Sequence, residues 1–145
     1  MKETVIIPEP KTLDFTGRFF AFDGFENLPE FFMREFNVKK GDWKIVKLEN
    51  EGTGLEIKDK EVAIWGDEAL NYASILQLIV QGEGCIPEVK VEESLKFSFR
   101  GYHLDIARGG VPKVETFKTI LGWLFLLKYN YFAIYQPWLK RYNGH

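Results

Sequence analysis

Residues 99 to 135 constrain the fold of this chain most, because they change periodicity from strand to helix and back to strand. Phe99 to Ala107 predicts a first strand of aromatic and aliphatic residues with Asp105 inside the pattern, and Gly109-Gly110 ends it. From Lys113 to Lys128 the apolar residues recur at helical spacing, and Asn130 is expected to end this helix in a left-handed conformation. Tyr131 to Tyr135 then predicts a second strand. Two strands joined by a helical crossover should be parallel, with a right-handed connection.

The first part of the chain begins with short apolar and aromatic runs. Val5 to Ile7 predicts a short strand. Leu13 to Phe22 predicts a hairpin that turns at Thr16-Gly17. Asn27 has capping-box spacing to Glu30, so a helix is expected to start there.

The middle of the chain combines strand and helix patterns. Trp43 to Leu48, Leu55 to Lys58 and Glu61 to Trp65 alternate with period two, which is typical of an antiparallel meander with one solvated face. Asp67 to Gln81 has the apolar spacing of a second helix, and Ile86 to Val91 predicts one more strand.

These patterns together predict an α+β fold in two domains. Residues 1–95 should form a small antiparallel sheet covered by two helices. Residues 96–145 should form a β-α-β unit that follows it.

Composition narrows the class of protein. The 145 residues are 46% apolar and 16% aromatic, which favours a well-buried core, and the net charge of −2 gives no case for binding nucleic acid or an anionic membrane. The run GWLFLLKYNYFAIY contains Lys128 and Asn130 and is not a membrane span, and the start lacks the apolar core of a signal peptide. We therefore expect a cytoplasmic protein. Cys85, the single cysteine, is expected to be a small buried hydrophobic residue.

A combination of short motifs carries a family resemblance. Arg100-Gly101, Leu104-Asp105 and Arg108 give the order R-G-x-x-L-D-x-x-R, and a helix then leads to K-x-N at Lys128 and Asn130. This order resembles the opening of the catalytic barrel of family 20 glycoside hydrolases, the β-N-acetylhexosaminidases. The segments WGDEALNYASILQLIVQ and IPEVKVEESLKFSFRG are similar to the non-catalytic domain that precedes that barrel. The resemblance thus implies that residues 96–145 are the first strand, helix and strand of a (β/α)8 barrel.

The resemblance also implies a chemistry. Family 20 enzymes remove terminal N-acetylhexosamine from glycans by a retaining mechanism in which the sugar's own acetamido group attacks the anomeric carbon, and they need no cofactor. An aspartate and a glutamate that end the fourth barrel strand polarise this group and protonate the leaving oxygen. Because this chain is expected to contain only the first two strands, no catalytic residue is assigned, and the chain alone should be inactive.

Two residues are candidates for substrate binding. Arg108 matches the family arginine that holds hydroxyl groups of the sugar, and it follows the first strand at the carboxyl end, where barrel enzymes place their sites. Its guanidinium can donate two parallel hydrogen bonds, which a lysine cannot. Asp105 is the second candidate, with a structural pairing to an arginine as the alternative.

Other residues have structural interpretations. Arg100 lies at the start of its strand, the end associated with stability, and His103 is expected to be a satisfied core residue. Gly66-Asp67-Glu68 resembles a catalytic pair in spelling, but acidic residues in a first helical turn are favoured by the helix dipole. Pro137 stands where close relatives carry a glutamate. No spacing supports a metal site, a nucleotide loop or a serine triad.

Two functions remain open at this point. The first is the N-terminal part of a β-N-acetylhexosaminidase-like glycoside hydrolase. The second is a stand-alone interaction or carbohydrate-binding protein that uses the same scaffold. A reading frame that continues after His145 would favour the first hypothesis. In either case an incomplete barrel predicts self-association, and a homodimer is expected.

Overall fold

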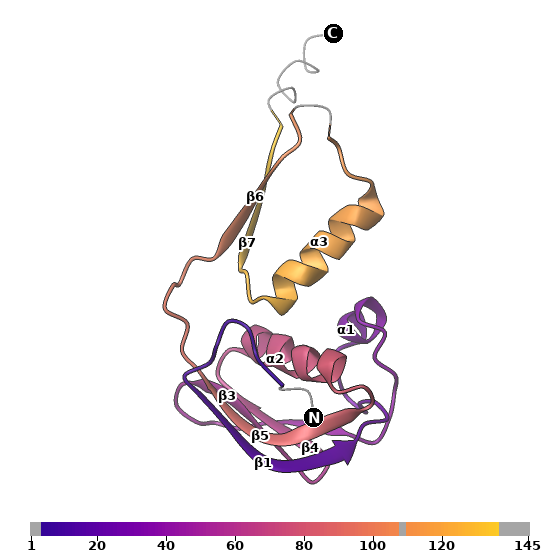
Figure 1. Ribbon diagram of the computed structural model, residues 1–145, viewed down its shortest axis with the longest axis vertical. Coiled ribbons are helices and arrows are strands. Elements are labelled where there is room, and N and C mark those ends of the chain that lie inside the picture. Colours follow the sequence, from indigo (N-terminus) through magenta and orange to yellow (C-terminus); the bar gives the residue numbers. More distant parts are fainter. Residues whose placement is uncertain (1–3, 108–109, 137–145) are drawn as a thin grey trace. The chain divides into compact units, whose positions relative to one another are not determined.

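The computed structural model describes residues 4–107 and 110–136 (Figure 1). The chain divides into two compact units, Met1–Lys96 and Phe97–His145. Along the described chain, the first unit contains β1 (Thr12–Ala21), α1 (Glu30–Glu35), β2 (Lys44–Lys47), β3 (Thr53–Lys58), β4 (Glu61–Trp65), α2 (Glu68–Gln81) and β5 (Cys85–Glu93), and the second contains β6 (Gly101–Asp105), α3 (Val114–Leu126) and β7 (Tyr131–Tyr135).

The first unit is built on a mixed sheet with the strand order β1-β5-β3-β4-β2. The antiparallel pairing of β3 with β4 confirms one part of the predicted meander. The other part is wrong, because β2 pairs in parallel with β4 and not with β3. Period-two alternation sets which face of the sheet a residue takes, but it sets neither the neighbour nor the direction of a strand. The predicted α+β class is correct, whereas the sheet is mixed where an antiparallel one was expected.

The predicted hairpin at Thr16-Gly17 is also wrong, because the whole run forms one strand, β1. Phe15 pairs with Val89, but Phe19 already pairs with Pro87, so three residues of β1 face a single residue of β5. The turn residues thus form a three-residue bulge in a continuous strand, and within it Gly17 takes a positive φ of +86°.

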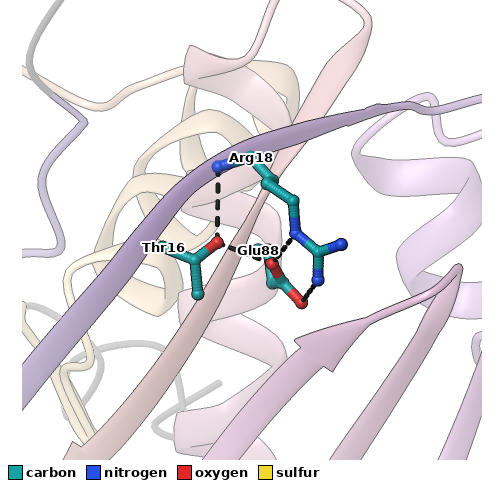
Figure 2. Close-up of polar contacts among 3 residues, drawn as sticks. All are labelled: Thr16, Arg18 and Glu88. Carbon is teal, nitrogen blue, oxygen red and sulfur yellow. Dashed lines mark hydrogen bonds and ion pairs between the residues drawn. The ribbon is translucent and has the colours of Figure 1, made fainter.

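Polar contacts hold the bulge in place. Glu88 of β5 accepts a hydrogen bond from Thr16 Oγ1 at 2.6 Å and two more from Nε and Nη2 of Arg18 (Figure 2). The bonds from Arg18 first, and then the bond from Thr16, lower the pKa of the Glu88 carboxyl below its ordinary value. The hydrogen bond to Glu88 correspondingly raises the pKa of Arg18.

We expect Glu88→Gln to lower the melting temperature near neutral pH, with a smaller effect in acid. A carboxyl whose pKa is lower in the folded state stabilises the fold above its unfolded pKa of about 4.5, and this contribution is lost as the pH falls through the folded pKa. Thermal unfolding of both proteins from pH 7 down to about pH 3 checks this. The exposed Glu56 of β3 provides the control, because Glu56→Gln should change the melting temperature little at every pH tested. If the melting temperature of Glu88→Gln lies below that of the parent by the same amount at every pH, the prediction is contradicted.

Helix α1 starts later than the capping box predicts. Its N-cap is Pro29, and no side chain caps it. Asn27 instead binds the backbone of β2: its Nδ2 donates to Ile45 O at 2.7 Å, and its Oδ1 accepts from Ile45 N at 2.8 Å. The amide of Asn27 thereby replaces a strand neighbour at this point.

Helix α2 confirms the predicted second helix and packs on β3, β4 and β5. Residues 4–9, which we call the strap, form no strand, contrary to the prediction for Val5 to Ile7. Two glutamines one turn apart on α2 bind the strap backbone instead. Gln81 accepts from Val5 N at 3.0 Å and donates to Val5 O at 2.7 Å, and Gln77 makes the same two bonds with Ile7, both at 2.7 Å.

The core of the first unit is apolar and aromatic. The indole of Trp43 is fully buried, with edge-to-face contacts to Phe20, Phe22 and Phe25, and its Nε1 donates to Ala21 O at 3.2 Å. Cys85 is exposed, so the expectation of a buried cysteine is wrong. Cys85 is the first residue of β5, directly after a glycine-rich turn, and it lies outside the core.

The second unit is a parallel strand pair with a helix between the strands in sequence. β6 and β7 pair in register from Gly101↔Tyr131 to Asp105↔Tyr135, which confirms the predicted parallel arrangement. Lys128, not Asn130, takes the left-handed conformation after α3, with φ of +61°. No helix in the described part of the chain is long and apolar enough to cross a membrane.

Candidate functional site

The carboxyl ends of β6 and β7 form the candidate site. Because the strands are parallel and in register, their last residues, Asp105 and Tyr135, lie opposite each other. The pairing continues one residue further, since Ile106 N donates to Tyr135 O at 3.1 Å. Ligands of parallel α/β folds bind beyond such strand ends, which makes this edge the expected position for a site.

Asp105 is turned towards the loop that follows β6. Its Oδ1 accepts a hydrogen bond from Ala107 N at 2.8 Å, an Asx turn that fixes the first residues of this loop. The side chain of Asp105 is exposed. Its alternative interpretation, a structural pairing with an arginine, stays open. Arg108 lies just outside the described residues, and its role in substrate binding stays a prediction, as does that of Asp105. Pro137 also lies outside them.

His103 and Tyr135 are two further residues at this edge. His103 lies two positions before Asp105, on the same face of the strand pair, and its ring contacts Tyr135 edge-on with centroids 6.1 Å apart. His103 is exposed, so the expectation of a core histidine is wrong. Tyr135 was not singled out from the sequence, although its place at the end of the second predicted strand was a usable signal. The face therefore presents an imidazole, a carboxylate and a phenol, a set that suits hydrogen bonding to hydroxyl groups.

The opposite end of the strand pair is a structural centre around Arg100. Its Nε donates to Lys128 O at 2.6 Å, and its Nη1 donates to Phe97 O at 2.5 Å. The side chain of Asn130 completes the arrangement: it accepts from Arg100 N at 2.9 Å and donates to Ser98 O at 2.7 Å. These bonds explain why Asn130 does not serve as the left-handed helix terminator. They agree with the structural interpretation of Arg100, since its donors are directed to backbone carbonyls.

The Gly66-Asp67-Glu68 tripeptide is structural, as predicted. Asp67 caps α2, and its Oδ1 accepts from Ala69 N at 2.9 Å and from Leu70 N at 3.2 Å. Glu68 pairs with Lys47 Nζ at 2.6 Å. Both carboxylates have these roles in the first unit, so the tripeptide is not a catalytic pair. Within the described ranges, no group of three or more His, Cys, Asp and Glu side chains could hold a metal ion.

Comparison with known proteins connects this geometry to glycoside hydrolases. No protein-family model and no curated protein sequence matches the chain. Solved structures do. A glycoside hydrolase family 20 β-N-acetylglucosaminidase is 25% identical with a TM-score of 0.70, and the match covers 92% of this chain and 31% of that enzyme.

Two further structures show the same fold. A β-N-acetylhexosaminidase from Bacteroides fragilis is 20% identical with a TM-score of 0.67, over 91% of this chain and 33% of that one. A family 20 exo β-N-acetylglucosaminidase from Vibrio harveyi, solved with N-acetylglucosamine, is 19% identical with a TM-score of 0.67. This match covers 93% of this chain and 26% of that enzyme. The chain thus spans about a third of the length of these enzymes, and it has the resemblance to family 20 glycoside hydrolases that its sequence motifs predict.

Proposed function

We propose that this chain is part of a β-N-acetylhexosaminidase-like glycoside hydrolase. Residues 1–95 are its non-catalytic α+β domain, and residues 96–145 are the first strand, helix and strand of its catalytic barrel. The complete enzyme removes terminal N-acetylhexosamine from glycans by the substrate-assisted retaining route, without a cofactor. The observation that carries the proposal is the match of 92% of the chain to a family 20 β-N-acetylglucosaminidase.

The site residues belong to the same proposal. Arg108 binds sugar hydroxyls through the two-pronged geometry of its guanidinium. Asp105, held by its bond to Ala107 N, fixes the start of the loop that carries Arg108 and contributes to the same pocket. Support comes from the place of Asp105 at the carboxyl edge of two parallel strands, the edge at which barrel enzymes bind their substrates.

A chimera tests the assignment. This chain replaces the matching third of the family 20 β-N-acetylglucosaminidase, and hydrolysis of an aryl N-acetyl-β-glucosaminide is measured. We expect a folded chimera with activity, because the catalytic pair of the host is then combined with the sugar-binding residues of this chain. A chimera that melts cooperatively but has no activity contradicts the proposal.

The chain by itself is expected to form a homodimer. β6 and β7 each have one neighbour among the described strands, so each has an unpaired edge. Helix α3 has no buried residue in the described structure, and Trp123 is 63% exposed. Full burial of a large apolar side chain stabilises a fold by about 1.5–3 kcal/mol. Four such side chains that stay exposed would therefore forgo roughly 10 kcal/mol of stabilisation, which a second copy of the chain can supply by covering them. Light scattering at tens of micromolar measures the mass, and a stable monomer contradicts the prediction.

A second function is the stand-alone interaction or carbohydrate-binding protein. It requires no barrel chemistry, and an exposed apolar groove in the first unit favours it. The chimera separates the two functions, since a purely binding protein has no reason to support hydrolysis.

A further inference from the structure

The strand pair of β6 and β7 has two faces of different character, because side chains alternate along each strand and residues paired in register share a face. Leu104 is half-buried and Ile106, just after β6, is 9% exposed, so their apolar face suits packing under α3. His103, Asp105 and Tyr135 lie on the other face and are exposed. We call this other face the inner face, since the helices of a (β/α)8 barrel form an outer ring and leave it to line the interior.

The two ends of the inner face differ. At the amino end the rings of Phe99 and Tyr131 have centroids 5.0 Å apart, and a Cβ atom at Gly101 would lie 2.8 Å from Cζ of Phe99. Aromatic rings therefore fill the amino end. At the carboxyl end, Asp105 and Tyr135 present a carboxylate and a phenol that are exposed. The carboxyl end is thus the part of the inner face that can hold a polar ligand.

The ring of Tyr135 is packed against a neighbour on this face. His103 pairs with Ala133, and Tyr135 lies two positions further along β7, so the imidazole and the phenol are diagonal neighbours. Aromatic side chains are long enough to reach across such a diagonal, and the small side chain of Ala133 leaves the space between them free. The two rings meet at 86° with centroids 6.1 Å apart, the edge-to-face arrangement that aromatic pairs prefer.

Tyr135 has the chemistry of a residue that contacts a sugar. Its side chain remains 49% exposed although one part of the ring packs on His103. Tyrosine combines an apolar ring with a hydroxyl group that both donates and accepts hydrogen bonds, and a pyranose likewise offers C–H surface and hydroxyl groups. A ring that is already held in place loses less conformational entropy when a ligand binds.

We propose that Tyr135 contacts the substrate in the sugar pocket and that His103 is the positioning residue that holds the Tyr135 ring. The ligand is a pyranose with free hydroxyl groups, whose C–H face packs on the phenol ring and one of whose hydroxyl groups bonds to Tyr135 Oη. This inference rests on the proposed function, because the inner face becomes a pocket when the remaining strands of a barrel enclose it. His103 acts through its ring and transfers no proton.

The ring pair is tested first in the 145-residue chain, where no activity is needed. Nuclear Overhauser spectra should show contacts between the imidazole protons of His103 and the ring protons of Tyr135. The contacts should persist in Tyr135→Phe, which keeps the ring. A folded chain without these contacts overturns the positioning role, whether or not the chain is part of a hydrolase.

Matched substitutions at the two ends of β7 test the contact with the sugar in a protein that completes the barrel, either the chimera or a longer natural chain. Tyr135→Phe should raise KM for the aryl N-acetyl-β-glucosaminide about 2- to 10-fold with kcat little changed, because it removes one neutral hydrogen bond. Tyr131→Phe makes the same change at the amino end and should leave KM unchanged. An active protein in which both variants have the parental KM overturns the inference and leaves the proposed function intact. A folded parent without activity overturns the proposed function and this inference with it.

His103 is tested through its effect on Tyr135. His103→Ala removes the edge contact and should raise KM about 2- to 10-fold, the factor that an aromatic pair contributes, whereas His103→Phe keeps an aromatic edge and should restore the parental KM. In a Tyr135→Ala background, His103→Ala should raise KM no further. The positioning role is overturned if His103→Ala lowers the melting temperature without changing KM, if His103→Phe does not restore KM, or if the two alanine substitutions have additive effects.

Discussion

The chain alone is expected to release no measurable product from an aryl N-acetyl-β-glucosaminide. The resemblance places the polarising aspartate and the acidic glutamate after the fourth barrel strand, and this chain resembles only the first two. General acid catalysis contributes roughly 10²- to 10⁴-fold, and the contribution of the aspartate is lost in addition. The assay is absorbance of the released aryl alcohol, with a complete family 20 enzyme as the positive control.

The Asp67-Glu68 pair provides an internal check on this result. Because Asp67 caps α2 and Glu68 pairs with Lys47, Glu68→Gln should leave the absence of activity unchanged. If the chain turns over substrate about as fast as complete enzymes do, and keeps this activity after further purification, then the proposal that it lacks the catalytic aspartate and glutamate of the barrel is contradicted. Turnover that Glu68→Gln abolishes would show that the tripeptide is catalytic after all.

Arg108→Lys is expected to lower kcat/KM by about 10- to 150-fold in a protein that completes the barrel, either the chimera or a longer natural chain. Lysine keeps the charge but loses the planar pair of donors. A hydrogen bond that involves a charged group contributes about 1.5–3 kcal/mol, which gives this range at 1.4 kcal/mol per factor of ten. Steady-state kinetics on the aryl substrate measure the effect, and wild-type kinetics would show that Arg108 does not bind the sugar.

Arg100→Lys is the matched control, with the same chemical change at the other end of β6. Arg100 donates to the carbonyls of Lys128 and Phe97, which a lysine cannot reach with the same geometry. We therefore expect Arg100→Lys to lower the melting temperature while kcat/KM of the folded enzyme changes little. Arg108→Lys should have the reverse pattern.

The candidate site was only partly predictable from sequence. Asp105 was expected inside a strand that runs to Ala107, whereas β6 ends at Asp105, which lies opposite Tyr135. Its exposure and that of His103 were not predicted, because alternation within one strand does not say whether a further layer covers its face. Tyr135 became part of the site only through the register of β6 with β7.

The sequence by itself determined the elements whose signals are local. Helical periodicity predicted a helix over Asp67 to Gln81, and the structure has α2 at Glu68–Gln81 with Asp67 as its N-cap. The strands expected at Glu61 to Trp65 and Tyr131 to Tyr135 have the bounds of β4 and β7. The parallel pairing of β6 and β7 also followed, since the helix between them leaves little alternative.

The tertiary structure decided which groups satisfy the backbone. Only the folded chain shows that β2 pairs with β4, that Glu88 turns a predicted hairpin into a bulge, and that Gln77 and Gln81 take the place of a strand beside the strap. Each of these outcomes depends on residues about 20 to 80 positions apart, whose proximity no local pattern encodes. Every buried backbone group needs a partner, but the partner is chosen by what packing brings within reach.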